Sequence, residues 1–277
     1  MLKVYIFCGD CLSMPELPEV ETVVRQLQPL ITGKKIISIQ NLDHKILDKN
    51  VQNAVSHTIT VVHRRGKYIV MDLENNHSLL THLRMTGSFS YTPKRTNKQP
   101  LPYHRGTFQF QDGSQLQYHC MRRFSRITFL SQPQLQKVFS SLGPEVLDIT
   151  STQFQAQLSY YPKSQIKPKL MDQCVLAGVG NIYAQEALYH AGILPQRTIG
   201  TLSGKEWQKL HAELRKVLLL SIKNNGTTIK DYAHITGKGD FQHLLTVYQQ
   251  KRCPRNHPVH YEKVGGRGTY HCVKCQR

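Results

Sequence analysis

The sequence contains no run of about 18 apolar residues, which is the length that indicates a membrane-spanning helix. The pattern therefore predicts no membrane span. Acidic residues are scarce, since 18 Asp and Glu stand against 36 Lys and Arg and the formal net charge is +18. Soluble domains usually carry a net charge of roughly 2–8. The excess of cations favours a polyanionic partner, nucleic acid before an anionic membrane surface, over a charge that only maintains solubility.

Cysteines are few and odd in number, with seven in 277 residues. A scattered, odd set does not suit a disulfide framework, so the cysteine usage predicts a reducing cytoplasm. Cys120 and Cys174 are expected to be lone buried thiols, whereas Cys272 and Cys275 form a C-x2-C pair close to the end of the chain.

The first half of the sequence predicts one helix followed by strands. A chain of this length suggests two domains and can form a core without covalent staples. Apolar residues recur at helical spacing after Glu16, and Gly33 ends the pattern. They are Val20, Val23, Val24, Leu27 and Leu30. Residues 35–130 read as strands, with a hairpin turn at Asp112-Gly113. This part predicts an antiparallel β domain with a leading helix.

The composition changes at Gly143–Glu145, after which the pattern becomes helical. Ser203–Glu206 is a capping box ahead of a helix that Gly226 ends. Two glycines and an asparagine within Gly178–Asn181 predict a tight turn into another helix. Such a turn exposes backbone N–H groups to a phosphate, although a plain helix–helix turn fits this stretch equally well.

An acid stands beside a proline in Met14-Pro15-Glu16. Initiator methionine is commonly removed before proline, so translation from Met14 would leave Pro15 with a free secondary amine. Such an amine attacks an electrophilic carbon to give an iminium. The helix that follows disfavours a protonated amine at its positive end, which favours the reactive form. In the 277-residue chain the same nitrogen is a tertiary amide and has no nucleophilicity.

Residues 1–13 therefore decide whether Pro15 can react. Their apolar patch, Val4–Phe7, is too short for the apolar region of a signal peptide. Cys8 and Cys11 have C-x2-C spacing, but no βαβ pattern follows them, so a misplaced start explains the pair better than a redox or metal site. We expect residues 1–13 to be a non-native extension that is absent from the active protein.

Several separated motifs occur in order along the chain. They are Pro15–Glu21, Arg64–Tyr68, His82–Gly87, Arg122–Phe124, Met171-Asp172 with Gly178–Ala184, and Gly266–Thr269 before Cys272-x2-Cys275. In these motifs the chain resembles the formamidopyrimidine-DNA glycosylases, bifunctional glycosylases and lyases that remove oxidised purines such as 8-oxoguanine. The resemblance runs from Met14 to Gln276. The related endonuclease VIII type usually has Gly where this chain has Leu17. The chain therefore resembles the branch that removes oxidised purines more closely.

The resemblance implies a nucleophile and its acid. Pro15 attacks C1′ of the damaged nucleotide and releases the base; opening of the sugar gives an iminium, and β,δ-elimination then cuts the strand. Glu16 is the acid/base at the sugar oxygen. Glu19 and Glu186 match acidic positions that the family places near the active site. Each of these two could instead be a structural hydrogen-bond acceptor.

The resemblance also implies a set of contacts to DNA phosphates. Lys67 binds the phosphate beside the lesion, unless it is a solvated turn lysine. Lys167, Asn181 and Arg267 add contacts, the last from the metal-bearing hairpin and close to the reaction. Together they clamp and kink the duplex, which positions it without reading its sequence.

Three further matched residues fill the space that an extruded base leaves, because the base must leave the stack before its C1′ can be attacked. Met85 is an apolar wedge, Arg122 hydrogen-bonds the orphaned partner base and Phe124 stacks. Core packing is the alternative for Met85, since methionine commonly fills gaps.

The family's terminal hairpin carries four zinc cysteines, and this chain departs from that pattern. Its first pair retains only Cys253, and His257 at C-x3-H spacing can replace the missing cysteine. Cys253, His257, Cys272 and Cys275 would then hold one structural Zn2+ as a Cys3His set. A weakened three-ligand site, with His260 as a spare candidate, is the alternative.

Other departures are milder. Cys120 and Ser125 stand where the family often has Asp and Gly, and the lesion-recognition loop, residues 226–241, carries Thr228, Lys238 and Asp240 at variable places. They leave the exact lesion preference open.

The sequence thus predicts an α+β bifunctional DNA glycosylase with three parts: a catalytic N-terminal antiparallel β-sandwich with a leading helix (14–143), a DNA-binding helix–two-turn–helix domain (144–240) and a zinc β-hairpin (241–277). Its partner is double-stranded DNA with an oxidised purine, and it acts as a monomer in the cytoplasm, at the bacterial nucleoid. The alternative function is a catalytically silent protein that binds damaged DNA through the same clamp.

Overall fold

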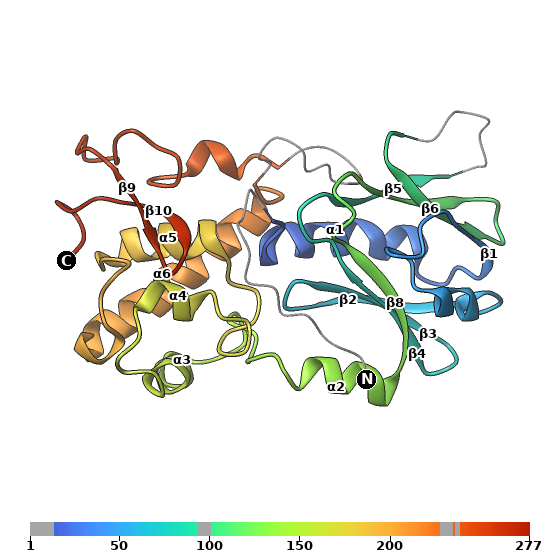
Figure 1. The fold of residues 1–277 in the computed structure, drawn as a ribbon, viewed down its shortest axis with the longest axis horizontal. Helices are drawn as coiled ribbons and strands as arrows, with labels where there is room; N and C mark the ends of the chain where they lie inside the picture. Colours follow the sequence, from blue (N-terminus) through green and yellow to red (C-terminus); the bar gives the residue numbers. More distant parts are fainter. Residues whose placement is uncertain (1–13, 94–100, 228–234, 236–238) are drawn as a thin grey trace.

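The computed structural model describes residues 14–93, 101–227, 235 and 239–277 (Figure 1). The expected extension, residues 1–13, and two positions of the lesion-recognition loop, Thr228 and Lys238, lie outside the described residues. Strands gather around helix α1 (Leu17–Ile31) in one part, and the other part is mainly helical (Figure 1). None of the described helices combines the length with the apolar content that a membrane crossing requires.

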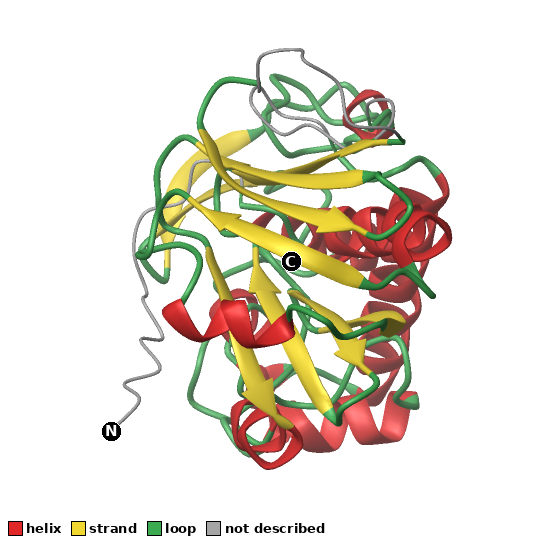
Figure 2. Cartoon of the chain, turned by 90° about the vertical axis from the view of Figure 1, so that its right-hand side faces the viewer, coloured by secondary structure: helices red, strands yellow, loops and turns green. Residues whose placement is uncertain are grey.

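Two four-stranded antiparallel sheets form the N-terminal part, one above the other in Figure 2. The first has the order β1-β6-β7-β5: β1 (Ile36–Asn41), β6 (His104–Phe110), β7 (Gln115–Cys120) and β5 (Gly87–Thr92). The second has the order β2-β3-β4-β8: β2 (Ile59–Arg65), β3 (Tyr68–Leu73), β4 (His77–His82) and β8 (Arg126–Ser131). A short 3-10 helix, η1 (Lys49–Ala54), contacts β8 and β1. The predicted hairpin is confirmed: β6 and β7 meet around Gly113, whose φ of +84° suits glycine.

One apolar core joins both sheets to α1, which makes this part a β-sandwich with a leading helix. Val20, Leu27 and Ile31 of α1 pack with Phe110 of β6 and Leu79 of β4. The helical spacing in the sequence is therefore the buried stripe of α1. Cys120 is buried at the edge of this core, as expected, whereas Cys174 is exposed and the prediction of a buried thiol there was wrong. Cys174 follows the short turn after α4, where its N–H donates to Asp172 Oδ1 (3.1 Å).

The C-terminal part packs helices around a second core. Its elements are α3 (Ser151–Ser159), α4 (Ile166–Leu170), α5 (Asn181–Ala191), η2 (Ile199–Thr201), α6 (Gly204–Lys223) and η3 (Phe241–Leu244). Helix α2 (Gln132–Phe139) precedes them and packs on β4 and β8 of the sandwich instead. The predicted capping box is confirmed, since Ser203 N–H donates to Glu206 Oε2 (2.8 Å) and Glu206 N–H to Ser203 Oγ (3.4 Å). A hairpin of β9 (His260–Val264) and β10 (Arg267–His271) follows.

The start of α1 lies where the two parts meet. Leu17 belongs to the core of the helical part, while Val20 and the later apolar residues of α1 belong to the sandwich core. Leu17 N–H donates to Gly178 O (3.1 Å), which fixes the first turn of α1 against the loop before α5. Pro15 and Glu16 are therefore held between the sandwich and the helices.

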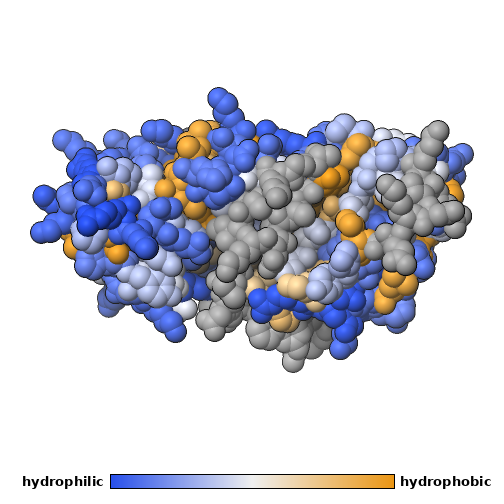
Figure 3. Space-filling view, turned by 90° about the horizontal axis from the view of Figure 1, so that it is seen from above, coloured by the Kyte–Doolittle hydropathy of each residue, from blue (hydrophilic) through white to orange (hydrophobic). Residues whose placement is uncertain are grey.

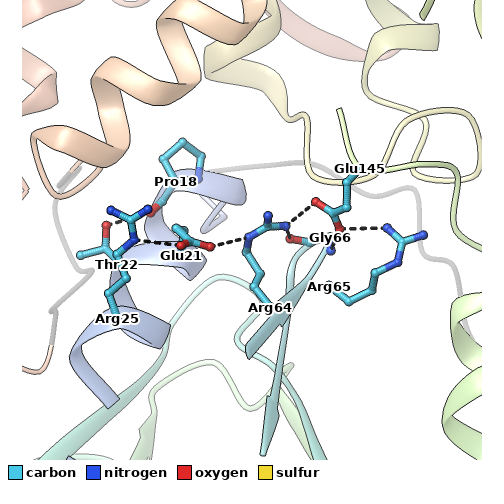
Figure 4. A network of polar contacts seen from close by, with 8 residues as sticks. All are labelled: Pro18, Glu21, Thr22, Arg25, Arg64, Arg65, Gly66 and Glu145. Carbon is cyan, nitrogen blue, oxygen red and sulfur yellow. Dashed lines mark hydrogen bonds and ion pairs between the residues drawn. The ribbon is translucent and has the colours of Figure 1, made fainter. Parts of the chain in front are cut away.

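A polar network ties the two parts together beside this junction (Figure 4). Glu145, at the composition change, accepts from Arg64 Nη1 (2.6 Å) and Arg65 Nη1 (2.9 Å) of β2. It also accepts from Gly66 N–H (2.5 Å) in the β2–β3 turn, and Arg64 Nε pairs with Glu21 of α1 (2.9 Å). The network fixes the turn that precedes β3. The described residues on the face seen in Figure 3 are mostly hydrophilic, with small separate hydrophobic patches.

Candidate active site and DNA-contact surface

Glu16 is the carboxylate at the junction of the two parts, and it is almost fully buried. Its Oε1 accepts from Ile182 N–H (3.0 Å) and its Oε2 from Tyr183 N–H (3.5 Å), both in the first turn of α5. The positive end of a helix stabilises a carboxylate in this place. The predicted tight turn into a helix is therefore present, but its N–H groups meet the protein's own carboxylate rather than lying open to a phosphate.

Glycine is required in that turn because Glu16 and its neighbour come so close. A Cβ on Gly180 would lie 2.1 Å from the carboxyl carbon of Glu16. A Cβ on Gly178 would lie 2.5 Å from Leu17 Cδ1, and Gly178 has a φ of +95°. Because the two glycines of the motif have no Cβ, the start of α1 can pack against the loop before α5.

The environment of Glu16 favours its protonated form near neutral pH. Burial raises the pKa of Glu16 to about 7, against the opposing effect of the positive charge of Lys67; the nearby carboxylate of Glu19 raises it further. A group with this pKa can both give and accept a proton at neutral pH. Pro15, the residue before it, is buried at the same place.

Glu19 is held by a cluster of hydroxyl and backbone donors. It accepts from Thr227 N–H (2.8 Å), from Glu16 N–H (2.8 Å) and from the Tyr183 hydroxyl. The Tyr183 oxygen also lies 2.7 Å from Ser221 Oγ and 2.9 Å from Thr227 Oγ1. Thr227 belongs to the lesion-recognition loop expected from the sequence, whereas Ser221 had no predicted role. The two stand 44 and 38 positions from Tyr183, so only the fold shows that they meet it.

Glu186 lies on α5 but makes its hydrogen bonds elsewhere. It accepts from the backbone N–H groups of Thr246 (2.8 Å), Val247 (3.0 Å) and Tyr248 (2.8 Å). Val247 in turn packs on Cys253 and Cys272. These contacts favour the reading of Glu186 as a structural acceptor that holds the segment leading into the terminal hairpin.

Lys67 and Lys167 lie close enough to Glu16 to interact with its charge, and Arg267 lies close enough to interact with Lys167. Lys67, in the turn before β3, is buried, so it is not a solvated turn lysine. Lys167 of α4 is fully buried and donates from Nζ to Asn181 Oδ1 (2.7 Å), while Asn181 Nδ2 donates to Gly268 O of β10 (3.2 Å). Burial lowers the pKa of Lys167 to about 8, with Glu16 opposing and Arg267 adding to the shift.

The three residues expected to fill the space of an extruded base come from two neighbouring turns. Met85, in the turn between β4 and β5, is half-buried. Arg122 and Phe124, between β7 and β8, are exposed, and the Arg122 guanidinium carbon lies 5.3 Å from the centre of the Phe124 ring. Arg122 N–H donates to Thr86 Oγ1 (3.0 Å), which joins the second turn to the first.

Among the described residues, one group of side chains has the spacing of metal ligands. The donor atoms of Cys253, His257, Cys272 and Cys275 all lie within 4.8 Å of one another. His257 Nδ1 is 3.3 Å and Cys253 Sγ is 3.8 Å from Cys275 Sγ. His260, the spare candidate, lies on β9 outside this group. Three thiolates and an imidazole form a donor set that suits zinc.

Comparisons with known proteins agree with this architecture. The family model "Formamidopyrimidine-DNA glycosylase N-terminal domain" matches residues 14–127, and the model "Formamidopyrimidine-DNA glycosylase H2TH domain" matches residues 142–233. The formamidopyrimidine-DNA glycosylase of an Exiguobacterium species is 37% identical over 279 residues, which covers 95% of this chain and 100% of the relative. That of Geobacillus kaustophilus is 36% identical at the same coverage.

Solved structures give the same result. Lactococcus lactis Fpg in complex with DNA containing an abasic site has a TM-score of 0.87 at 32% identity, over 95% of this chain and all of that one. MutM in complex with DNA containing carbocyclic 8-oxo-G has a TM-score of 0.86 at the same identity and coverage. Fold and site together define a DNA glycosylase built from a β-sandwich, a helical part and a terminal hairpin. The chain belongs to the formamidopyrimidine-DNA glycosylase family, so the predicted resemblance and fold class are confirmed.

Proposed function

We propose that the protein excises oxidised purines, 8-oxoguanine and formamidopyrimidines, from duplex DNA through a Schiff base on Pro15, and then cuts the strand. The observation that carries the proposal is the buried carboxylate of Glu16, with a pKa of about 7, directly after Pro15 and within the field of Lys67 and Lys167. A nucleophile and an acid on adjacent residues can reach one sugar. The cations provide charge for the phosphates on either side of it.

The steps follow from these groups. The Pro15 nitrogen forms a bond to C1′ while the bond from C1′ to the base breaks, and the base leaves with the electron pair and a proton. Glu16 gives its proton to the sugar oxygen as the ring opens, which leaves an iminium between C1′ and Pro15. Transfer of the C2′ proton to water gives an enamine that expels the 3′ phosphate, and loss of the C4′ proton to water in the second elimination expels the 5′ phosphate. Hydrolysis of the remaining iminium then frees Pro15.

The clamp that we propose uses three cations and one amide. Lys67, Lys167, Arg267 and the Asn181 side chain contact phosphates around the lesion, and the net charge of +18 supports this role. Met85, Arg122 and Phe124 enter the duplex where the base has left. Structures of relatives contain DNA with Fapy-dG, an 8-oxo-G analogue and an abasic site, which supports damaged duplex DNA as the partner.

We further propose that Cys253, His257, Cys272 and Cys275 hold one structural Zn2+. When bound, the ion would hold the ends of the hairpin together, and Arg267 stands at the start of β10 in that hairpin. The boundaries 14–143, 144–240 and 241–277, the monomeric state and the location at the nucleoid are parts of the same proposal.

Replacement of His257 tests the zinc assignment. His257→Ala is expected to lose most of its zinc, measured by elemental mass spectrometry, and to bind lesion duplex about tenfold more weakly because Arg267 is less fixed. His257→Cys should retain the metal, as should His260→Ala, the matched control outside the group. An unchanged metal content in His257→Ala would remove His257 from the site.

Base release from a defined duplex tests the function itself. Protein that begins at Pro15 is expected to free 8-oxoguanine from a duplex with a single lesion and to leave a gap with phosphates at both ends, detected by mass spectrometry. Undamaged duplex of the same sequence is the control. Tight binding of the lesion duplex without base release or cleavage would instead support the silent damage-binding protein.

A further inference from the structure

The turn that carries Arg122 and Phe124 contains a strained residue. Arg123, between the two, has a φ of +55°, in the left-handed region that non-glycine residues rarely adopt. Such a conformation is unfavourable and persists only where surrounding contacts impose it. We call residues 121–125 the wedge turn. Its contacts with the rest of the protein must hold Arg123 in this conformation.

Arg123 is held by a buried carboxylate from a distant segment. Its Nε and Nη2 donate to Asp43 Oδ2 (2.6 Å) and Oδ1 (2.9 Å), a two-pronged pair. Asp43 lies between β1 and η1, its side chain is 4% exposed, and its backbone oxygen accepts from Ile46 and Leu47 N–H (both 2.9 Å). The Arg123 guanidinium lowers the pKa of Asp43. The Arg123 side chain is 49% exposed, but both of its paired nitrogens are bound to Asp43, whereas Arg122 and Phe124 are exposed.

A threonine joins the wedge turn to the turn that carries Met85. Thr86 Oγ1 accepts from Arg122 N–H (3.0 Å) and lies 3.5 Å from Cys120 Sγ, at the base of the wedge turn. Arg105 Nε, on β6, donates to Cys120 O (2.9 Å) at the same base. The two turns are therefore in fixed register before any DNA is present.

We propose that Asp43 and Thr86 are positioning residues for base extrusion, and that Arg123 is their internal anchor rather than a contact to DNA. This inference rests on the proposed function. The anchor presents Arg122 and Phe124 already ordered, so the cost of ordering them is not added when they enter the duplex. Substitution of Asp43 or Thr86 should therefore slow the reaction only with substrates in which a base must be extruded from a stack and its partner base contacted.

The experiment compares two substrates. One is a duplex with a single 8-oxoguanine opposite cytosine, and the other is a single-stranded oligonucleotide with an abasic site, which needs no extrusion. Thr86→Val and Asp43→Asn are expected to slow single-turnover base release from the duplex about tenfold, as loss of a hydrogen bond or ion pair at this position implies. Borohydride trapping on the single strand should stay at the wild-type rate.

Matched variants separate positioning from general damage to the fold. Thr86→Ser keeps the accepting oxygen and should restore the duplex rate. Asp48→Asn removes a more exposed carboxylate, paired with Arg126 at 3.2 Å, and should leave both rates unchanged. Melting temperatures show whether Asp43→Asn folds, and Thr86→Val tests the inference independently if it does not. All variants are made in the protein that begins at Pro15. Equal losses on both substrates, or no loss on the duplex, would overturn the proposal; if the unmutated protein that begins at Pro15 traps neither substrate, the proposed function is refuted instead.

A double-mutant comparison gives the sharper result. If Asp43 acts through the wedge turn, Asp43→Asn should have little further effect on duplex base release once Arg122→Ala is present. Additive losses would show that Asp43 does not act through Arg122 and would overturn that part of the proposal.

Discussion

Protein that begins at Pro15 is expected to form a borohydride-stable adduct with lesion duplex, and the 277-residue chain is expected to form none. In the long chain the Pro15 nitrogen is an amide, its lone pair is delocalised, and no iminium can form on it. The two proteins differ only in residues 1–14. The adduct is measured as a band of reduced mobility and by the intact mass of the conjugate.

Duplex binding is the control for this comparison. The clamp residues Lys67, Lys167 and Arg267 belong to parts of the chain that both proteins share, so a long chain that binds but does not trap would isolate the amine as the missing group. Trapping by the long chain at the same rate would point to a lysine as the nucleophile. Pro15→Gly, in the short protein, should keep duplex affinity and slow base release. Unchanged excision by this variant would contradict the assignment of Pro15.

Local pattern predicted much of the fold. The stripe of α1, the hairpin at Asp112-Gly113 and the capping box at Ser203–Glu206 each arise within one turn or one hairpin, so the sequence alone contains their cause. Cys174 shows the limit of the same reasoning. Nothing beside it in the sequence indicates that the turn after α4 faces outward.

The site was predictable only in part, because its contacts join residues far apart in the sequence. Motifs identify Glu16 and Lys67, but the partners of Glu16 are N–H groups 166 and 167 positions away. The pairing of Arg123 with Asp43 spans 80 positions and uses residue types that are common everywhere. For the same reason the sequence leaves the turn before α5 open between a phosphate site and a plain helix–helix turn, since only the fold brings the start of α1 onto it.

Glu16→Gln is expected to lower base release by roughly 10²–10⁴, the usual contribution of a positioned acid, and at the same time to stabilise the protein at pH 8. The second effect follows from the pKa. The folded protein holds this proton up to about pH 7, whereas the unfolded chain loses it near the ordinary value of 4.5. Between these values the folded state binds more protons, so stability falls as pH rises through the window.

Glu16→Gln removes this fall in stability, because the glutamine does not titrate. A shift from 4.5 to about 7 corresponds to on the order of 3 kcal/mol at pH 8, from which the weaker hydrogen bonds of an amide to Ile182 and Tyr183 must be subtracted. The gain should therefore be measurable by chemical denaturation at pH 8 and should shrink toward pH 5. The inflection near pH 7 in single-turnover base release should disappear together with the acid.

Glu21→Gln, on the same helix, is expected to change the stability at pH 8 in the opposite direction. Burial raises the pKa of Glu21, but hydrogen bonds from Arg25 and Arg64 outweigh burial and the net shift is downward. Its charge therefore stabilises the fold above the ordinary carboxyl pKa and is lost in acid, so Glu21→Gln should weaken the protein at pH 8 while base release keeps its inflection near pH 7. A pH profile unchanged in Glu16→Gln, or a loss of stability at pH 8 in that variant, would show that Glu16 is not the buried acid of the reaction.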